Sequence, residues 1–108
     1  MIEYKIRLTR RAREDLIDIG DYISHTLSSP ETAHHFLCGL KKSLLSLKTF
    51  PYKFPIIQDS VLVKQNIHYF PYKNYFVFYI LSDASQQIIV VRIGYHYRNW
   101  TKLLNNPE

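Results

Sequence analysis

The chain has 108 residues, of which 46% are hydrophobic and 21% are charged, so its size and composition suit one compact domain over residues 1–108. It contains no apolar run long enough to span a membrane, and its first residues lack the apolar core of a signal peptide. The single cysteine, Cys38, excludes a disulfide within the chain. These features together predict a cytoplasmic protein without a membrane segment.

The net charge of +5 is unevenly distributed along the sequence. Residues 1–40 contain five Lys or Arg and six Asp or Glu, whereas residues 41–102 contain nine and two. An excess of cations in one part of a chain favours a polyanion or an acidic protein as the partner. A solvated basic surface has the same composition, so charge alone leaves both interpretations open.

The first half of the chain predicts one strand and two helices. Residues 3–8 alternate between polar and apolar, which is typical of a strand. Thr9 stands where a helix cap is expected, and the restart at Ser29 and Pro30 places a cap before a proline at the first helical position. Apolar residues recur at helical spacing in both segments: Ala12, Leu16, Ile19, Ile23 and Leu27, then Ala33, Leu37, Leu40, Leu44 and Leu47. The short connection predicts an antiparallel helical hairpin.

The acidic residues of the first helix, including Asp15 and Asp18, are predicted to lie on its solvent face. After a proline-containing loop over 50–60, three strands are predicted at 61–69, 75–81 and 87–93. Residues 70–74 and 83–86 are predicted turns, and 99–105 a short final helix. The order β-α-α-β-β-β predicts an α+β domain in which an antiparallel sheet packs against the N-terminal helical hairpin.

The strand at 87–93 leads into a segment rich in chemically useful side chains. Arg92 is predicted to share a face with the apolar residues Ile88 and Val90, where it is either a structural arginine or part of a site. His96 has the near-neutral pKa that suits an acid or a base. Tyr72 and Lys73 combine an aromatic ring with a cation, as surfaces that bind single-stranded nucleic acid do.

No metal or cofactor site is predicted. His34 and Cys38 are four residues apart on the second helix, but two ligands do not complete a zinc site, and no second pair has suitable spacing. The three glycines are isolated, so there is no phosphate-binding glycine loop.

The chain resembles the RelE/ParE toxin superfamily over nearly its whole length. The resemblance comprises Ala12 to Ile23 and Ala33 to Pro51, which are similar to the family's helical hairpin, and Pro71 to Tyr79 and Ile89 to Trp100, which are similar to its sheet. It implies the toxin of a type II toxin–antitoxin pair, restrained by a cognate antitoxin, without metal or cofactor. RelE-like members cut mRNA on the ribosome, whereas ParE-like members poison DNA gyrase.

The resemblance also assigns candidate roles. His96 and Tyr97 match the catalytic histidine and following tyrosine of YoeB-like ribonucleases, and Arg98 matches an arginine common in the superfamily. Phe76 departs from the pattern, because those ribonucleases usually hold an arginine there.

We therefore predict growth inhibition by ribosome-dependent mRNA cleavage, with His96 as acid or base and Tyr97 as proton donor or stacking group. The remaining candidates are the phosphate-stabilising Arg92 and Arg98, and the nucleic-acid-binding Lys64, Lys73, Tyr72 and Trp100. Two alternatives are a non-catalytic gyrase poison and an inactive module that retains only its antitoxin interface.

Overall fold

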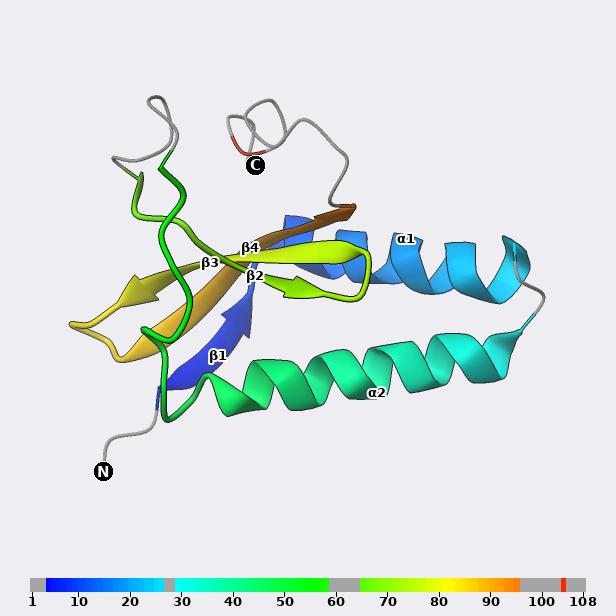
Figure 1. The fold of residues 1–108 in the computed structure, drawn as a ribbon, viewed down its shortest axis with the longest axis horizontal. Coiled ribbons are helices and arrows are strands. Elements are labelled where there is room, and N and C mark those ends of the chain that lie inside the picture. The colour runs from blue at the N-terminus through cyan, green and yellow to red at the C-terminus, as the bar shows by residue number, and fades with distance from the viewer. Residues whose placement is uncertain (1–3, 27–28, 59–64, 96–103, 105–108) are drawn as a thin grey trace.

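The computed structural model describes residues 4–26, 29–58, 65–95 and 104. The helices of this part run antiparallel as a hairpin that packs against one face of a sheet (Figure 1). The predicted α+β class and the predicted order of helices and strands are confirmed. The elements are β1 (Lys5–Leu8), α1 (Arg10–Thr26), α2 (Pro30–Ser46), β2 (His68–Tyr72), β3 (Tyr75–Ser82) and β4 (Gln87–Tyr95).

The sheet has the strand order β1-β4-β3-β2. The pairs β2–β3 and β3–β4 are antiparallel, but β1 runs parallel to β4, with Lys5 opposite Gln87 and Leu8 opposite Val90. The sheet is thus mixed, which differs from the wholly antiparallel sheet that we predicted. Only strands joined by a tight turn must be antiparallel, and the long connection through the hairpin allows β1 to enter in the other direction.

Both predicted helix caps are present. Thr9 Oγ1 accepts a hydrogen bond from the backbone N–H of Ala12 at 3.1 Å. Ser29 Oγ accepts one from the N–H of Thr32 at 3.1 Å, and Pro30 follows it in the first turn. Each hydroxyl satisfies one of the N–H groups that a helix start leaves without a partner, and this fixes where the helices begin.

The strand β2 lies later in the sequence than predicted. It covers His68–Tyr72, so Phe70 and Tyr72 belong to the strand and not to the turn that we predicted at 70–74. The chain reverses at Lys73, which has a φ of 54°. The turn was predicted because residues 70–74 include Pro71, and a proline usually interrupts a strand. An edge strand tolerates a proline, since its outward N–H needs no partner in the sheet.

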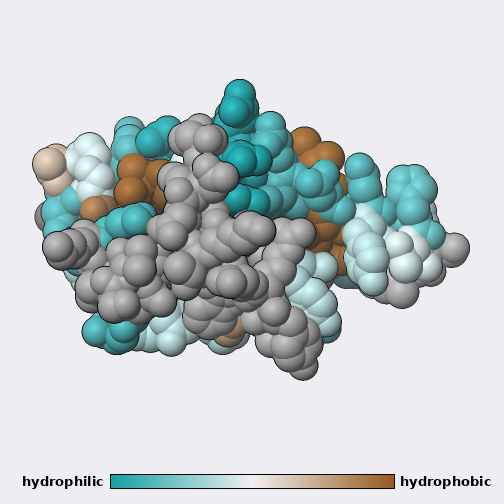
Figure 2. All heavy atoms as spheres, turned by 90° about the horizontal axis from the view of Figure 1, so that it is seen from above, coloured by the Kyte–Doolittle hydropathy of each residue, from teal (hydrophilic) through white to brown (hydrophobic). Residues whose placement is uncertain are grey.

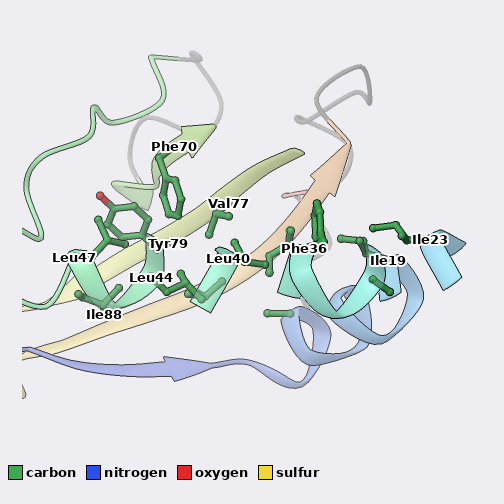
Figure 3. Packing of buried hydrophobic residues seen from close by; sticks show 14 residues of the cluster. Ile19, Ile23, Phe36, Leu40, Leu44, Leu47, Phe70, Val77, Tyr79 and Ile88 are labelled. Carbon is green, nitrogen blue, oxygen red and sulfur yellow. The ribbon is translucent and has the colours of Figure 1, made fainter. Parts of the chain in front are cut away.

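The main core lies between the hairpin and the sheet, as Figure 3 shows. Side chains from α1 and α2 meet those of β2, β3 and β4 there, and Val77, Tyr79, Ile88 and Val90 are completely buried. A smaller cluster on the opposite face contains Ile57, Ile67, Phe78 and Leu104. The two faces of the sheet are therefore both covered within the described part of the chain.

Candidate functional site

The predicted functional segment begins at the end of β4, and a cleft of about 630 Å³ opens beside that end. Its walls come from α1, α2, the turn between β2 and β3, and the last residues of β4. We call it the tyrosine cleft; it is lined by Asp15, Asp18, Ile19, Tyr22, Ile23, Thr32, Phe36, Lys73, Asn74, Tyr75, Ile93, Gly94 and Tyr95.

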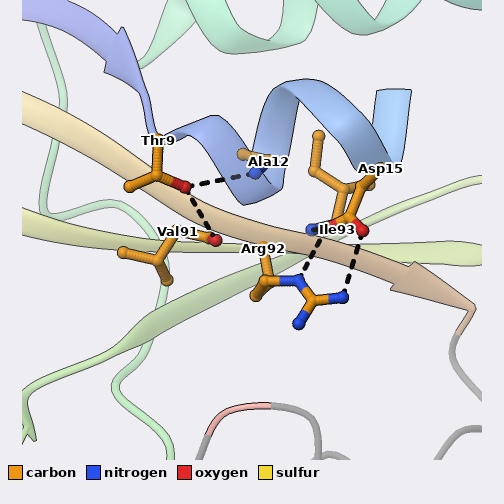
Figure 4. Close-up of polar contacts among 6 residues, drawn as sticks. All are labelled: Thr9, Ala12, Asp15, Val91, Arg92 and Ile93. Carbon is orange, nitrogen blue, oxygen red and sulfur yellow. Dashed lines mark hydrogen bonds and ion pairs between the residues drawn. The ribbon is translucent and has the colours of Figure 1, made fainter. Parts of the chain in front are cut away.

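Arg92, predicted as a phosphate-stabilising group, forms an ion pair with Asp15 of this lining. Its Nε donates to Asp15 Oδ2 at 2.8 Å and its Nη2 donates to Oδ1 at 3.1 Å, as drawn in Figure 4. The two side chains are only 9% and 13% exposed. The backbone N–H of Ile93 adds a third hydrogen bond to Asp15 Oδ2 at 2.9 Å. The charge of Arg92 is therefore compensated inside the protein.

The position of Arg92 follows from an extra residue in β4. Phe78 pairs with Arg92, whereas the next residue, Tyr79, pairs with Val90, which leaves Val91 as the insertion. Such a bulge reverses the alternation of the side chains that follow it. Arg92 thus shares the face of Phe78, away from the main core, while Val90 lies in that core. The prediction that Arg92 shares a face with Ile88 and Val90 is therefore wrong, because both of those residues lie in the main core.

The start of α1 replaces a strand along the free edge of β4. Beyond the end of β1, the N–H of Thr9 donates to the carbonyl of Val90 at 3.0 Å, and Thr9 Oγ1 donates to the carbonyl of Val91 at 3.1 Å. Asp15 then accepts the N–H of Ile93. The prediction of a solvent-exposed Asp15 is therefore wrong, because this carboxylate completes the hydrogen bonding of the strand edge.

Three tyrosine side chains line the cleft. Tyr22 is 57% exposed and Tyr95 is 41% exposed, whereas Tyr75 is half-buried. The rings of Tyr75 and Tyr95 lie 5.6 Å apart between centroids, at 36°. Burial raises the pKa of Tyr75, and the nearby phenols of Tyr22 and Tyr95 raise it further. The three side chains, which come from α1, β3 and β4, thus gather at one place.

Two predicted nucleic-acid-binding residues are neighbours at the end of β2, where Tyr72 is the last residue of the strand and Lys73 begins the turn to β3. Tyr72 is partly buried, and its hydroxyl donates to the carbonyl of Phe36 at 2.8 Å. Gly39 makes room for it, since a Cβ there would collide with the Tyr72 hydroxyl. The ammonium of Lys73 lies 5.8 Å from the centre of the Tyr72 ring. Lys73 lines the cleft, whereas Tyr72 is held by α2.

The other predicted site residues lie outside the described residues, so their roles remain predictions. They are His96, Tyr97, Arg98, Trp100 and Lys64. Phe76, the position at which the sequence departs from the ribonucleases that it resembles, packs edge-on against Tyr69, with ring centroids 5.6 Å apart.

The described residues contain no group of three or more His, Cys, Asp or Glu side chains placed to hold a metal ion. Cys38 Sγ and His34 Nε2 lie 3.5 Å apart on an exposed part of α2. None of the described helices combines the length and apolarity that crossing a membrane requires.

Sequence reasoning missed Asp15, Tyr22 and Tyr75 as parts of the site. A signal was available for α1, because Asp15, Asp18 and Tyr22 recur at intervals of three and four residues and must share a helix face. Nothing in the sequence indicated that this face meets the end of β4.

The family model described as "ParE toxin of type II toxin-antitoxin system, parDE" matches residues 6–100. The chain belongs to this family. The search of curated proteins gave no match for the toxin.

Solved structures with the same fold as this toxin include a chain of the chromosomal ParDE toxin–antitoxin system from P. aeruginosa. Its TM-score is 0.69 at 17% identity, over 86% of this toxin and 96% of that chain. A chain of the RelBE2 toxin–antitoxin complex from Mycobacterium tuberculosis has a TM-score of 0.64 at 16% identity, over 88% and 93%. A mutant of the E. coli toxin RelE in the free state gives 0.63 at 13% identity, over 97% and 98%.

Proposed function

We propose that this toxin arrests growth by binding DNA gyrase, without catalysing a reaction. The observation that carries the proposal is the ion pair between Arg92 and Asp15. A ribonuclease must hold the extra negative charge that develops on the scissile phosphate, and it does so with cations that are free to face that phosphate. Arg92 instead gives two of its N–H groups to a carboxylate in a nearly buried position.

The environment of Phe76 supports the same proposal. In the resembling ribonucleases this position usually holds an arginine, whereas here it is an aromatic side chain that packs against Tyr69 and belongs to the apolar cover of the second face. The charge of Arg92 is thus neutralised by Asp15, and the second charge is missing because the position holds Phe76. A protein-binding toxin needs neither charge.

A ribosome-dependent ribonuclease is the second candidate, and the segment from Tyr95 to Arg98 favours it. His96 would remove the proton of the RNA 2′-hydroxyl, so that this oxygen attacks the adjacent phosphate and the 5′-oxygen leaves with a proton. Arg98 and Tyr97 would stabilise the phosphate and supply the proton.

We further propose that the toxin is restrained by a cognate antitoxin, since two of the similar structures come from toxin–antitoxin systems. We also propose that the toxin acts in the cytoplasm, where gyrase works on DNA. An apolar groove of about 690 Å³ between α1 and α2 offers surface for a protein partner. Ile17 on its rim is 62% exposed.

The test compares two assays with the same purified toxin. We expect inhibition of supercoiling by purified gyrase, and intact mRNA in a translation extract. We expect His96→Gln and Tyr97→Phe to leave gyrase inhibition within about threefold of the unmodified toxin, because no proton is transferred. Cleaved mRNA together with uninhibited gyrase would contradict the proposal and establish the ribonuclease. Inactivity in both assays, with antitoxin binding retained, would identify an inactive antitoxin-binding module.

A further inference from the structure

We propose that the tyrosine cleft binds an arginine side chain of a protein partner. The inference rests on the proposed function in one respect, namely that this toxin acts by contacting a protein. The choice of an arginine rests on the residues that line the cleft. Aromatic rings, an accessible carboxylate and apolar side chains lie close together there, at the end of β4.

Two of the three tyrosine side chains of the cleft are exposed to solvent. Tyr22 and Tyr95 are 57% and 41% exposed, and Tyr95 lies beside the half-buried Tyr75. A planar guanidinium stacks on tyrosine rings and is attracted to their negative faces. Tyrosine and arginine are also among the residues enriched at the energetically important positions of protein interfaces.

The accessible carboxylate is Asp18. It lies one turn before Tyr22 on α1, so both side chains project from the same face of the helix. Asp15, one turn earlier, is already bonded to Arg92 and Ile93. Among the described residues, Asp18 forms no ion pair, and it is exposed. An incoming guanidinium can therefore pair with Asp18 without breaking the interactions of Asp15.

The remaining lining accommodates the rest of an arginine side chain. Ile19, Ile23 and Ile93 are buried and form part of the floor, against which the methylene groups of an arginine can pack. The one lysine of the lining, Lys73, has its ammonium near the ring of Tyr72, which does not line the cleft.

Figure 2 shows the hydropathy of the surface from above the view of Figure 1. Much of the described surface is hydrophilic, and it is interrupted by separate hydrophobic areas. A nucleotide suits the cleft less well than an arginine, because its phosphate would lie near the carboxylate of Asp18.

The test is an NMR titration of the 108-residue toxin, labelled with nitrogen-15, with capped tripeptides. The probe is acetyl-Leu-Arg-Leu amide, and the matched control is the same peptide with citrulline, which keeps the shape but removes the charge. We expect the arginine peptide to shift the amide signals of Tyr22, Tyr75 and Tyr95 and to bind at least fivefold more tightly than the citrulline peptide. Equal binding by both peptides, or no shift at these residues, would overturn the proposal.

Variants locate the binding in the cleft. Asp18→Asn should weaken binding of the arginine peptide about threefold to fivefold, since it removes one exposed charge. Asp21→Asn is the matched control, because Asp21 is exposed on the same helix but lines the groove between the helices. We expect no change for Asp21→Asn. Equal weakening by both variants would show a general charge effect and contradict a specific site.

Two further outcomes separate this proposal from neighbouring ones. Adenosine monophosphate that shifts the same signals at lower concentration than the arginine peptide would overturn the proposal and indicate a nucleobase site. Peptide binding does not require gyrase. A toxin that inhibits gyrase but does not bind the arginine peptide would therefore refute only the arginine site. Peptide binding without gyrase inhibition refutes only the proposed target.

Discussion

Two carboxylates at opposite ends of β4 are held in similar ways but in different surroundings. Asp83, in the turn before β4, accepts hydrogen bonds from the hydroxyls of Tyr4 at 2.7 Å and Tyr52 at 2.6 Å. Asp15, at the far end, accepts bonds from Arg92 and from the N–H of Ile93. The Asp83 cluster is exposed to solvent, whereas Asp15 and Arg92 are almost buried.

The difference in exposure explains why the hydrogen bonds of Asp83 and those of Asp15 should affect stability unequally. Water competes with the donors around Asp83 and screens its charge, so the net contribution to stability is small. The charges of Asp15 and Arg92 have lost most of their hydration, and each therefore depends on the other. We infer that the junction of α1 and β4 is sensitive to the loss of either charge, because the remaining charge would be buried without its partner. The Asp83 cluster should be far less sensitive, because water can replace the lost partner.

The largest effect is expected from Asp15→Ala. This variant leaves the guanidinium of Arg92 and the N–H of Ile93 without their acceptor, so we expect a loss of about 3–5 kcal/mol in the free energy of unfolding. Urea denaturation measures it. Asp18→Ala is the matched control on the same helix and should change stability by no more than about 0.5 kcal/mol. Similar losses in both variants would remove the distinction between the buried and the exposed carboxylate.

An intermediate effect is expected from Thr9→Val at the same junction. The valine keeps the shape of threonine but cannot accept from Ala12 or donate to the carbonyl of Val91. We expect a loss of about 1–2 kcal/mol by urea denaturation. Thr26→Val, at the exposed end of α1, serves as the control and should have little effect. A tolerated Thr9→Val would mean that the strand edge does not need α1.

The smallest effect is expected from Asp83→Asn, and it depends on pH. Hydrogen bonds from Tyr52 and then Tyr4 lower the pKa of Asp83 below its ordinary value of 3.8. A carboxyl whose pKa is lowered by folding stabilises the protein above its unfolded pKa, and this stabilisation is lost as the pH falls through the folded value. As the pH is lowered below about 4, the stability of Asp83→Asn should therefore fall less than the stability of the unmodified toxin.

Thermal unfolding from pH 7 down to pH 2 measures that contrast. Asp21→Asn is a suitable control for the removal of one exposed acidic charge. Identical pH profiles for Asp83→Asn and the unmodified toxin would show that the two tyrosines do not favour the charged carboxylate.

The sequence predicted the parts of this fold that depend on local pattern. The spacing of apolar residues identified both helices, and Thr9 and Ser29 marked their starts. The bulge at Val91 has no local signature, and the role of Asp15 depends on it as well as on the parallel pairing of β1. The sequence therefore indicated Arg92 as an important residue but could not show that its partner is a carboxylate of α1.

We infer that Arg92 serves the fold and takes no part in a chemical reaction. This role is tested most directly by the double variant Asp15→Asn with Arg92→Gln, which removes both charges but leaves an acceptor for the N–H of Ile93. The measurement is gyrase inhibition per folded toxin, with the folded fraction taken from circular dichroism. We predict a value within about threefold of the unmodified toxin, because the guanidinium of Arg92 is already paired with Asp15 inside the protein. A folded double variant whose inhibition of gyrase is weaker by about a hundredfold or more would show instead that Arg92 or Asp15 acts directly on the target.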